Sequence, residues 1–181
     1  MTDDELYRTY LAGDESAGDE LMLRYGDSLT TYLSAILHST QDAEDLMLDC
    51  FTVILVDKPR IADGHFRAYL FRMARNMANR QWKFRFRRKE FSLDDEQLIS
   101  VESPEKQVWK EELSEILRRC MNRIAPQYRE ALWLVYDTRL SYAQTAKVLG
   151  CGVKRVDNLL LNGKKQLRLE LEKEGVTDAD F

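Results

Sequence analysis

Apolar side chains recur at intervals of three and four residues along most of this chain. Three stripes stand out: Ala43, Leu46, Met47, Cys50, Phe51, Ile54 and Leu55; Phe66, Leu70, Met73 and Met77; and Leu113, Ile116, Leu117, Cys120, Met121 and Ile124. This spacing gathers apolar side chains on one face of an α-helix. Only eight glycines and three prolines occur among the 181 residues, and no stretch shows a convincing alternation of the β-strand type. The sequence therefore predicts an all-α fold.

The helical pattern is interrupted between Phe91 and about Gln107. This segment is acidic and rich in turn-forming residues. A stretch of about fifteen such residues is long enough to let its neighbours move independently. We therefore expect two small helical domains, residues 1–90 and 108–174, joined by a flexible linker over 91–107, with Ser103 or Pro104 opening the second domain. A short tail follows at 175–181.

Charge is segregated along the chain, although the formal net charge is only −4. Acidic residues dominate the first 27 positions. The stretch Arg72–Lys89 carries eight cations and no acid, and Lys147–Arg168 carries six cations against the single Asp157. Such segregation is typical of a protein that binds a polyanion. Solvated basic faces with no ligand are the alternative for either stretch taken alone.

Several other classes of site and location are disfavoured. The three cysteines, Cys50, Cys120 and Cys151, and the two histidines, His38 and His65, share no metal-ligand spacing. We therefore expect no metal site and no cofactor, and we interpret the cysteines as small buried side chains. No apolar run reaches the ~20 residues that cross a bilayer, and the acidic N-terminus differs from a secretory signal. We expect a cytoplasmic protein without membrane insertion.

The last part of the chain has the features of a helix-turn-helix. Ser141 and Gln144 stand at the spacing of a capping box. Gly150 stands where a helix C-terminus needs a left-handed residue, and a second helix is expected from near Val153 after a turn at Cys151-Gly152. The residues expected to face inward are Tyr142, Ala146 and Leu149 in the first helix, and Val153, Val156, Leu160, Gly163, Leu167 and Leu171 in the second.

The other side of the second helix carries Lys154, Arg155, Asp157 and Asn158. A helix of this kind, lying in the major groove, reads bases with its first turns while cations hold phosphates. An ordinary helical hairpin with a charged face is the alternative. Leu159 and Leu161 lie off the inner stripe, and either pack against other helices of the domain or contact a partner.

The segment Arg75–Lys89 interleaves cations, amides and aromatic rings. Cations follow a phosphate backbone, and aromatic faces stack on unpaired bases. This chemistry favours single-stranded or melting DNA over an intact duplex. The alternative is a helix with solvated cations whose aromatic rings, Trp82 in particular, belong to the core.

Two parts of the sequence resemble the extracytoplasmic-function (ECF) sigma factors of bacterial RNA polymerase. Residues 42–46 (DAEDL), Phe51 and residues 66–76 (FRAYLFRMARN) resemble region two of that family. Residues 124–132 (IAPQYREAL) and 140–150 (LSYAQTAKVLG) resemble region four. The likeness spans roughly residues 5–170, with both regions in the family's order.

The resemblance implies a non-catalytic subunit that directs core RNA polymerase to specific promoters. Region two, here residues 1–90, would bind the core enzyme and open the −10 element. Region four, here residues 108–174, would read the −35 element as duplex. Core RNA polymerase and promoter DNA are the implied partners, and an anti-sigma factor is a further candidate.

The resemblance also assigns roles to individual residues. Asp42, Glu44, Asp45, Leu46, Asp49 and Phe51 would bind core polymerase; Arg75, Asn76, Asn79, Arg80, Trp82, Lys83, Arg85, Arg87 and Arg88 would engage the −10 element; and Lys154, Arg155, Asn158, Asn162, Lys164 and Lys165 would engage the −35 element. At Arg80, Gly152, Asp157 and Leu159 the chain departs from residues common in the family, so the promoter sequence stays open.

Three other functions fit parts of the pattern. A stand-alone helix-turn-helix regulator leaves the acidic helix and the basic, aromatic segment unexplained. A sigma mimic that captures an anti-sigma factor would not need the cations of both basic stretches. A nuclease would need carboxylates and histidines at metal-ligand spacing near those cations, and the sequence shows no such cluster.

Overall fold

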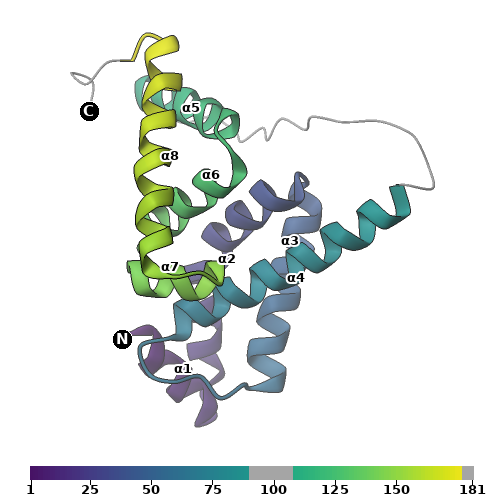
Figure 1. Cartoon of the computed structure of the whole chain (residues 1–181). Helices are drawn as coiled ribbons and strands as arrows, with labels where there is room; N and C mark the ends of the chain where they lie inside the picture. The colour runs from purple at the N-terminus through teal and green to yellow at the C-terminus, as the bar shows by residue number, and fades with distance from the viewer. Residues whose placement is uncertain (90–107, 177–181) are drawn as a thin grey trace. The chain divides into compact units, whose positions relative to one another are not determined.

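A computed structural model describes residues 1–89 and 108–176, except for the side chains of 85–89 and 108–112. The chain divides into two compact units, with the division between Val101 and Glu102. Helices, and no strands, make up the regular structure of the described residues (Figure 1). This confirms the predicted all-α class with two helical domains. The segment predicted as a linker, 91–107, and the predicted helix start at Ser103 or Pro104 lie outside the described residues.

The first unit contains the helices α1 (Asp3–Leu11), α2 (Glu15–Leu37), α3 (Thr40–Thr52) and α4 (Phe66–Lys89). A π-helical turn, η1 (Val53–Asp57), continues α3. Helix α2 packs against the other three helices, and α4 also packs against α1 and α3. The unit is therefore organised around α2.

Polar caps fix where the helices of the first unit begin. Thr2 and Glu5 form a reciprocal capping box on α1, and the side chains of Asp14 and Ser39 accept backbone N–H groups at the starts of α2 and α3. Helix α2 ends at His38, which takes the left-handed conformation with a φ of 54°. The short link at His38-Ser39 turns the chain so that α3 packs back on α2.

The core of the first unit combines aromatic and aliphatic side chains. The largest fully buried ones are Leu6, Leu21, Leu29, Tyr32, Leu33, Phe51, Ile54, Phe66, Leu70 and Phe71. The rings of Tyr32 and Phe71 meet edge to face, with their centroids 5.4 Å apart, an arrangement that aromatic pairs favour. The members of the first two predicted stripes are buried or half-buried, as expected.

The second unit contains α5 (Val108–Arg123), α6 (Pro126–Leu132), α7 (Tyr142–Leu149) and α8 (Val153–Lys173). The π-helical turn η2 (Trp133–Asp137) continues α6. Helix α8 packs against α5, α6 and α7, and Figure 1 shows it as the longest helix of this unit. The other three helices of the second unit therefore all pack against α8.

The core of the second unit lies along α8. Its main cluster comprises Ile124, Ala131, Leu132, Ala146, Val156, Leu159 and Leu160, and a smaller one comprises Cys120, Leu171 and Val176. The third predicted stripe is confirmed except at Leu117, whose residue surface is 37% exposed. Helix α5 packs chiefly on α8 and α6, so a narrower arc of it is buried than the stripe predicted.

Helices α6 and α8 approach each other closely at Gly163. A Cβ atom at this position would lie 3.2 Å from side-chain atoms of Leu132 and Tyr128, tighter than an ordinary van der Waals contact. Gly163 was predicted to face inward, and its burial confirms this.

Candidate nucleic-acid interfaces and acidic face

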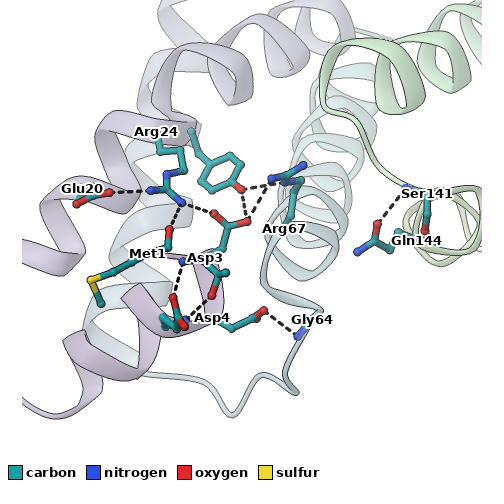
Figure 2. Close-up of polar contacts among 12 residues, drawn as sticks. Met1, Asp3, Asp4, Glu20, Arg24, Gly64, Arg67, Ser141 and Gln144 are labelled. Carbon is teal, nitrogen blue, oxygen red and sulfur yellow. Dashed lines mark hydrogen bonds and ion pairs between the residues drawn. The ribbon is translucent and has the colours of Figure 1, made fainter.

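Helices α7 and α8 form a helix-turn-helix whose ends are set by the residues that the sequence indicated. The Ser141 N–H donates to Gln144 Oε1 at 2.9 Å, and the Gln144 N–H donates to Ser141 Oγ at 3.2 Å (Figure 2 labels both residues). Gly150 ends α7 with a φ of 68°, a left-handed conformation that glycine adopts without strain. Helix α8 begins at Val153, with Gly152 as its N-cap. The capping box, the turn and the start of the second helix are confirmed.

The inward faces of the two helices differ from the prediction at their first residues. Tyr142 is 39% exposed and Val153 is 48% exposed. Each is the first residue of its helix and precedes the residues that pack against the rest of the unit. Leu159, which the predicted stripe left out, is buried at 8% exposure. It packs in the cluster that joins α8 to α6 and α7, so α8 buries a wider arc than a two-helix hairpin would.

Cations of α8 that precede Arg168 face solvent. Lys154, Arg155 and Lys165 are exposed, and they form no ion pair with any residue that the structure describes. The exposed amides Asn158 and Asn162 lie among them, and Asn162 Nδ2 donates to the Asn158 carbonyl at 3.0 Å. This surface offers positive charge and hydrogen-bonding groups, with Asp157 as the exposed acid among them.

Lys164 has a different environment. Its Nζ lies 5.0 Å from the centroid of the Tyr136 ring, on η2. A hydrogen bond to the Tyr136 hydroxyl raises the pKa of Lys164. Lys164 is thus tied to η2, whereas Lys165 is not.

Cations near the C-terminal end of α8 are ion-paired. Arg168 Nε lies 3.7 Å from Glu172, and Lys173 Nζ lies 2.5 Å from Glu170. From α5, Arg123 and Arg119 reach Glu174 at 2.6 Å and 3.2 Å. The hydrogen bond from Arg123 lowers the pKa of Glu174. The unpaired cations of this helix are therefore concentrated before Arg168.

A shallow hollow of about 190 Å³ opens beside the first half of α8. Gln127 and Tyr128 of α6 line one side, and Arg155, Asn158 and Asn162 line the other. Gln127 was not among the predicted site residues, because nothing in the local sequence pattern shows that α6 borders the first turns of α8.

Helix α4 changes character along its length. Phe66, Leu70, Ala74 and Ala78 are buried at 0–1% exposure, and the side chains after Ala78 are half-buried or exposed. Figure 1 shows the helix continuing past the rest of its unit. The first half of α4 therefore anchors the helix and the second half presents a surface.

The residues predicted to engage the −10 element follow this gradient. Asn76, Arg80 and Lys83 are exposed, while Arg75 and Asn79 are half-buried. Trp82 is 42% exposed and Phe84 is 66% exposed, so neither ring is a core side chain, and the reading of Trp82 as core is wrong. The side chains of Arg85, Arg87 and Arg88 lie outside the described residues.

A half-buried polar cluster ties the start of α4 to α1 and α2 (Figure 2). The Tyr25 hydroxyl donates to Asp3 Oδ2 at 2.5 Å, Arg67 Nε donates to the Tyr25 hydroxyl at 2.8 Å, and Arg24 Nη1 donates to Asp3 Oδ1 at 2.8 Å. Burial by itself raises the pKa of Asp3, but the hydrogen bonds from Tyr25 and Arg24 and the charge of Arg67 outweigh it, and the net pKa is lowered. Asp3 is thus an ionised anchor, which local sequence patterns did not indicate.

The predicted acidic face lies on α3. Glu44, Asp45 and Asp49 are exposed and Asp42 is half-buried. Leu46 and Phe51, which the resemblance grouped with them, are 5% and 0% exposed. Both side chains belong to the core, so they position α3 and offer no contact surface.

Two exposed apolar residues lie close to these carboxylates in the sequence. Leu48 is 50% exposed and Val56 is 71% exposed. The face thus combines negative charge with apolar surface, a combination that suits a protein partner.

Family models match both units. The model described as "Sigma-70 region 2" matches residues 21–89, and the model described as "Sigma-70, region 4" matches residues 114–167. Together they cover about two thirds of the 181 residues. The chain belongs to the ECF-type sigma factors of the sigma-70 family.

Curated relatives of this sigma factor have the same extent. The chain is 26% identical over 186 residues to the RNA polymerase sigma-H factor of Pseudomonas aeruginosa, covering 94% of each protein. It is 26% identical over 165 residues to the ECF RNA polymerase sigma factor SigM of Bacillus subtilis, covering 88% of this chain and 98% of the relative. The function of the present sigma factor is promoter-specific initiation of transcription, with core RNA polymerase and promoter DNA as partners.

Solved structures share the fold of this sigma factor. CnrH, solved in complex with the cytosolic domain of CnrY, superposes with a TM-score of 0.67 at 21% identity and covers 94% of this chain and 97% of that one. The sigma factor RpoE of Bartonella quintana, solved with the anti-sigma factor NepR, superposes with a TM-score of 0.71 at 19% identity, covering 85% and 96%.

The described residues also bear on metal binding and membrane insertion. They contain no group of three or more potential ligands that could hold a metal ion, and none of their helices is long and apolar enough to span a membrane.

Cys50 and Cys120 are buried and Cys151 is half-buried. Burial raises the pKa of the Cys50 thiol to about 12, which suits a small core side chain. Sigma factors are a non-catalytic family of initiation factors.

Proposed function

We propose that this sigma factor divides promoter recognition between the part of α8 that precedes Arg168 and the second half of α4, and that it binds core polymerase through the exposed face of α3. In domain terms, residues 1–90 bind the core enzyme and open the −10 element. Residues 108–174 read the −35 element as duplex, and residues 91–107 link the two.

The observation that carries the proposal is the distribution of ion pairs on α8. Lys154, Arg155 and Lys165 are exposed and form no ion pair within the described part of the chain, whereas Arg168 and Lys173 are paired with carboxylates. Cations already neutralised by a neighbour contribute less to phosphate binding. The footprint on DNA is therefore the part of α8 that precedes Arg168, where a helix-turn-helix meets the major groove.

The proposed role of α4 rests on its exposed aromatic rings. Trp82 and Phe84 are surrounded in the sequence by cations and are exposed. A duplex hides the faces of its bases, whereas an opened strand offers them for stacking. The −10 element, which must melt, is therefore the ligand that this surface suits.

The proposed polymerase contact is the face formed by Glu44, Asp45 and Asp49 with Leu48 and Val56. Carboxylates beside exposed apolar groups can pair with cations of a partner while the apolar groups are buried. Leu46 and Phe51 support this face from inside.

We also propose an anti-sigma factor as a third partner, and the cytoplasm as the location where the chain meets polymerase. The structural likeness to RpoE, solved with its anti-sigma factor, supports the first. Co-expression with the product of a neighbouring gene, followed by co-purification of the two, tests it.

Run-off transcription tests the proposed function. Core polymerase with the chain, supplied with a genomic promoter library, is expected to yield a small set of discrete transcripts that share two spaced elements. Core polymerase with the Asp45→Lys/Asp49→Lys variant is the matched control and should yield none of them. Tight, specific promoter binding by the chain alone in a gel shift would instead identify a stand-alone regulator.

A further inference from the structure

The most exposed large apolar side chain of α8 lies among its unpaired cations. Leu161 is 68% exposed. Lys154, Asn158, Leu161 and Lys165 follow one another at intervals of four, three and four residues, which places them on one side of the helix. Leu161 therefore points in the same direction as the unpaired cations.

The core does not use Leu161. Its neighbours Leu159 and Leu160 are 8% and 2% exposed and belong to the main cluster of the second unit. A single exposed leucine is ordinary on a protein surface. This one differs because Asn158 and Lys165, one turn to either side, belong to the surface proposed to read DNA.

The helix geometry lets Leu161 reach a base. At 1.5 Å of rise per residue, Leu161 lies about 10 Å along the axis from Lys154. The major groove is ~12 Å wide, so both side chains fit within it when the first turns of α8 lie against base edges. Lys165 lies about 6 Å further on, where a flanking phosphate would be.

We propose that Leu161 contacts the 5-methyl group of a thymine in the −35 element and so helps to determine promoter specificity. The thymine methyl is the apolar group that the major groove offers to a protein. Lys154 and Lys165, exposed on either side, favour a polyanion over an apolar protein surface. The inference rests on the proposed reading of duplex DNA by α8.

The test removes a single methyl group from the DNA. Holoenzyme assembled from core polymerase and the full chain selects a preferred −35 element from a randomised duplex pool. Each thymine of that element is then replaced, one at a time, by deoxyuridine. At one position we expect occupancy to fall about fourfold, the factor that corresponds to burying one methyl group. The Leu161→Ala holoenzyme should bind the thymine and uracil probes equally at that position.

Leu169→Ala is the matched control. Leu169 is also on α8 and is 50% exposed, but it lies in the ion-paired half of the helix, so this variant should keep the fourfold preference. The inference is overturned if no thymine methyl affects occupancy, or if Leu161→Ala retains the preference. It is also overturned if Leu161→Ala abolishes assembly with core polymerase, which would identify a protein contact.

A second variant separates this inference from the proposed function. If Arg155→Ala changes the selected −35 sequence while Leu161→Ala does not alter methyl sensitivity, only the role of Leu161 is wrong. If neither variant affects recognition of the −35 element, the assignment of α8 to duplex reading is wrong as well.

Discussion

Helices α4 and α8 are both basic, but their units support them differently. Helix α8 is anchored along nearly its whole length, from Val156 near its start to Leu171 near its end. Helix α4 is anchored only as far as Ala78, after which it exposes Trp82 and Phe84. A helix held throughout presents its side chains at fixed positions, as reading a duplex requires. A helix held at one end presents aromatic surface beyond its core, where unpaired bases can stack.

The ion pairs of the two units also differ in which helices they join. In the first unit, Arg24 and Arg67 are paired with Asp3, a residue only 16% exposed at its side chain, and join three helices. In the second unit, Arg119 and Arg123 of α5 also pair with Glu174 at the end of α8, whereas the pairs of Arg168 and Lys173 lie on one helix surface. Pairing therefore distinguishes cations that serve the fold from cations that remain for a ligand.

The largest expected effect tests whether core polymerase binds the exposed face of α3. Asp45→Lys/Asp49→Lys should abolish co-purification with core enzyme, because it sets like charges against the partner at a cost of about 2–5 kcal/mol. Asp19→Lys, at an exposed acid of α2, is the control and should co-purify normally. Retention of core binding by the double variant would remove α3 from the interface.

Trp82→Ala tests whether α4 acts on the opened strand. Loss of stacking at ~1–3 kcal/mol per base should lower transcription from a duplex promoter by roughly 5- to 150-fold. A template with a pre-opened −10 bubble should restore activity, and Trp82→Phe, which keeps an aromatic face, should retain most of it. Permanganate footprinting of −10 thymines measures the melting. Equal impairment on the bubble template would contradict a role in melting.

Arg155→Ala tests whether α8 reads the duplex. Loss of a base contact should relax specificity at one −35 position by ~1–3 kcal/mol and reduce promoter occupancy, while the occupied complexes still melt. Occupancy is measured by gel shift of the holoenzyme on single-base promoter variants. If melting disappears while occupancy stays intact, the roles of the two helices are reversed.

Acidification should weaken the anchor that Asp3 provides in the first unit. Because the pKa of Asp3 is lowered in the fold, its contribution is fully present above the unfolded pKa of about 4 and is lost as pH falls through the folded pKa. Asp3→Asn should therefore destabilise the first unit by about 1–3 kcal/mol at pH 7, and the difference should shrink below about pH 4.

Hydrogen exchange of the full chain measures this locally. Amides of α1 and α4 should exchange faster in Asp3→Asn, and those of α8 should not change. Glu174→Gln, at the surface pairs of the second unit, is the control and should leave α1 and α4 unaffected. Uniform acceleration in both units would contradict a local anchor.

The smallest effect compares two cations of α8. Lys165→Ala should reduce the slope of log affinity against log salt by about one unit, because an unpaired cation at a phosphate is lost. Arg168→Ala should reduce it by less, since Glu172 already lies 3.7 Å from that guanidinium. Fluorescence anisotropy of holoenzyme on promoter DNA over a salt series gives both slopes. Equal slopes would show that pairing does not decide which cations bind DNA.

The sequence by itself determined the local architecture of this sigma factor. The capping box of Ser141 and Gln144, the left-handed Gly150 and the helix start at Val153 depend on residues within one or two turns of each other. Local propensity and periodicity suffice for such features. The resemblance of residues 42–76 and 124–150 to regions two and four likewise depends on order along the chain.

Tertiary structure decided which side chains became surface. Burial of Leu159 and exposure of Leu161 depend on where α6 and α7 pack. The pairing of Asp3 with Arg67, and of Arg123 with Glu174, joins residues more than 50 positions apart. The placement of Gln127 beside Arg155 joins two helices. Periodicity gives the face of a helix but not its neighbours, because neighbours are chosen by the packing of whole elements.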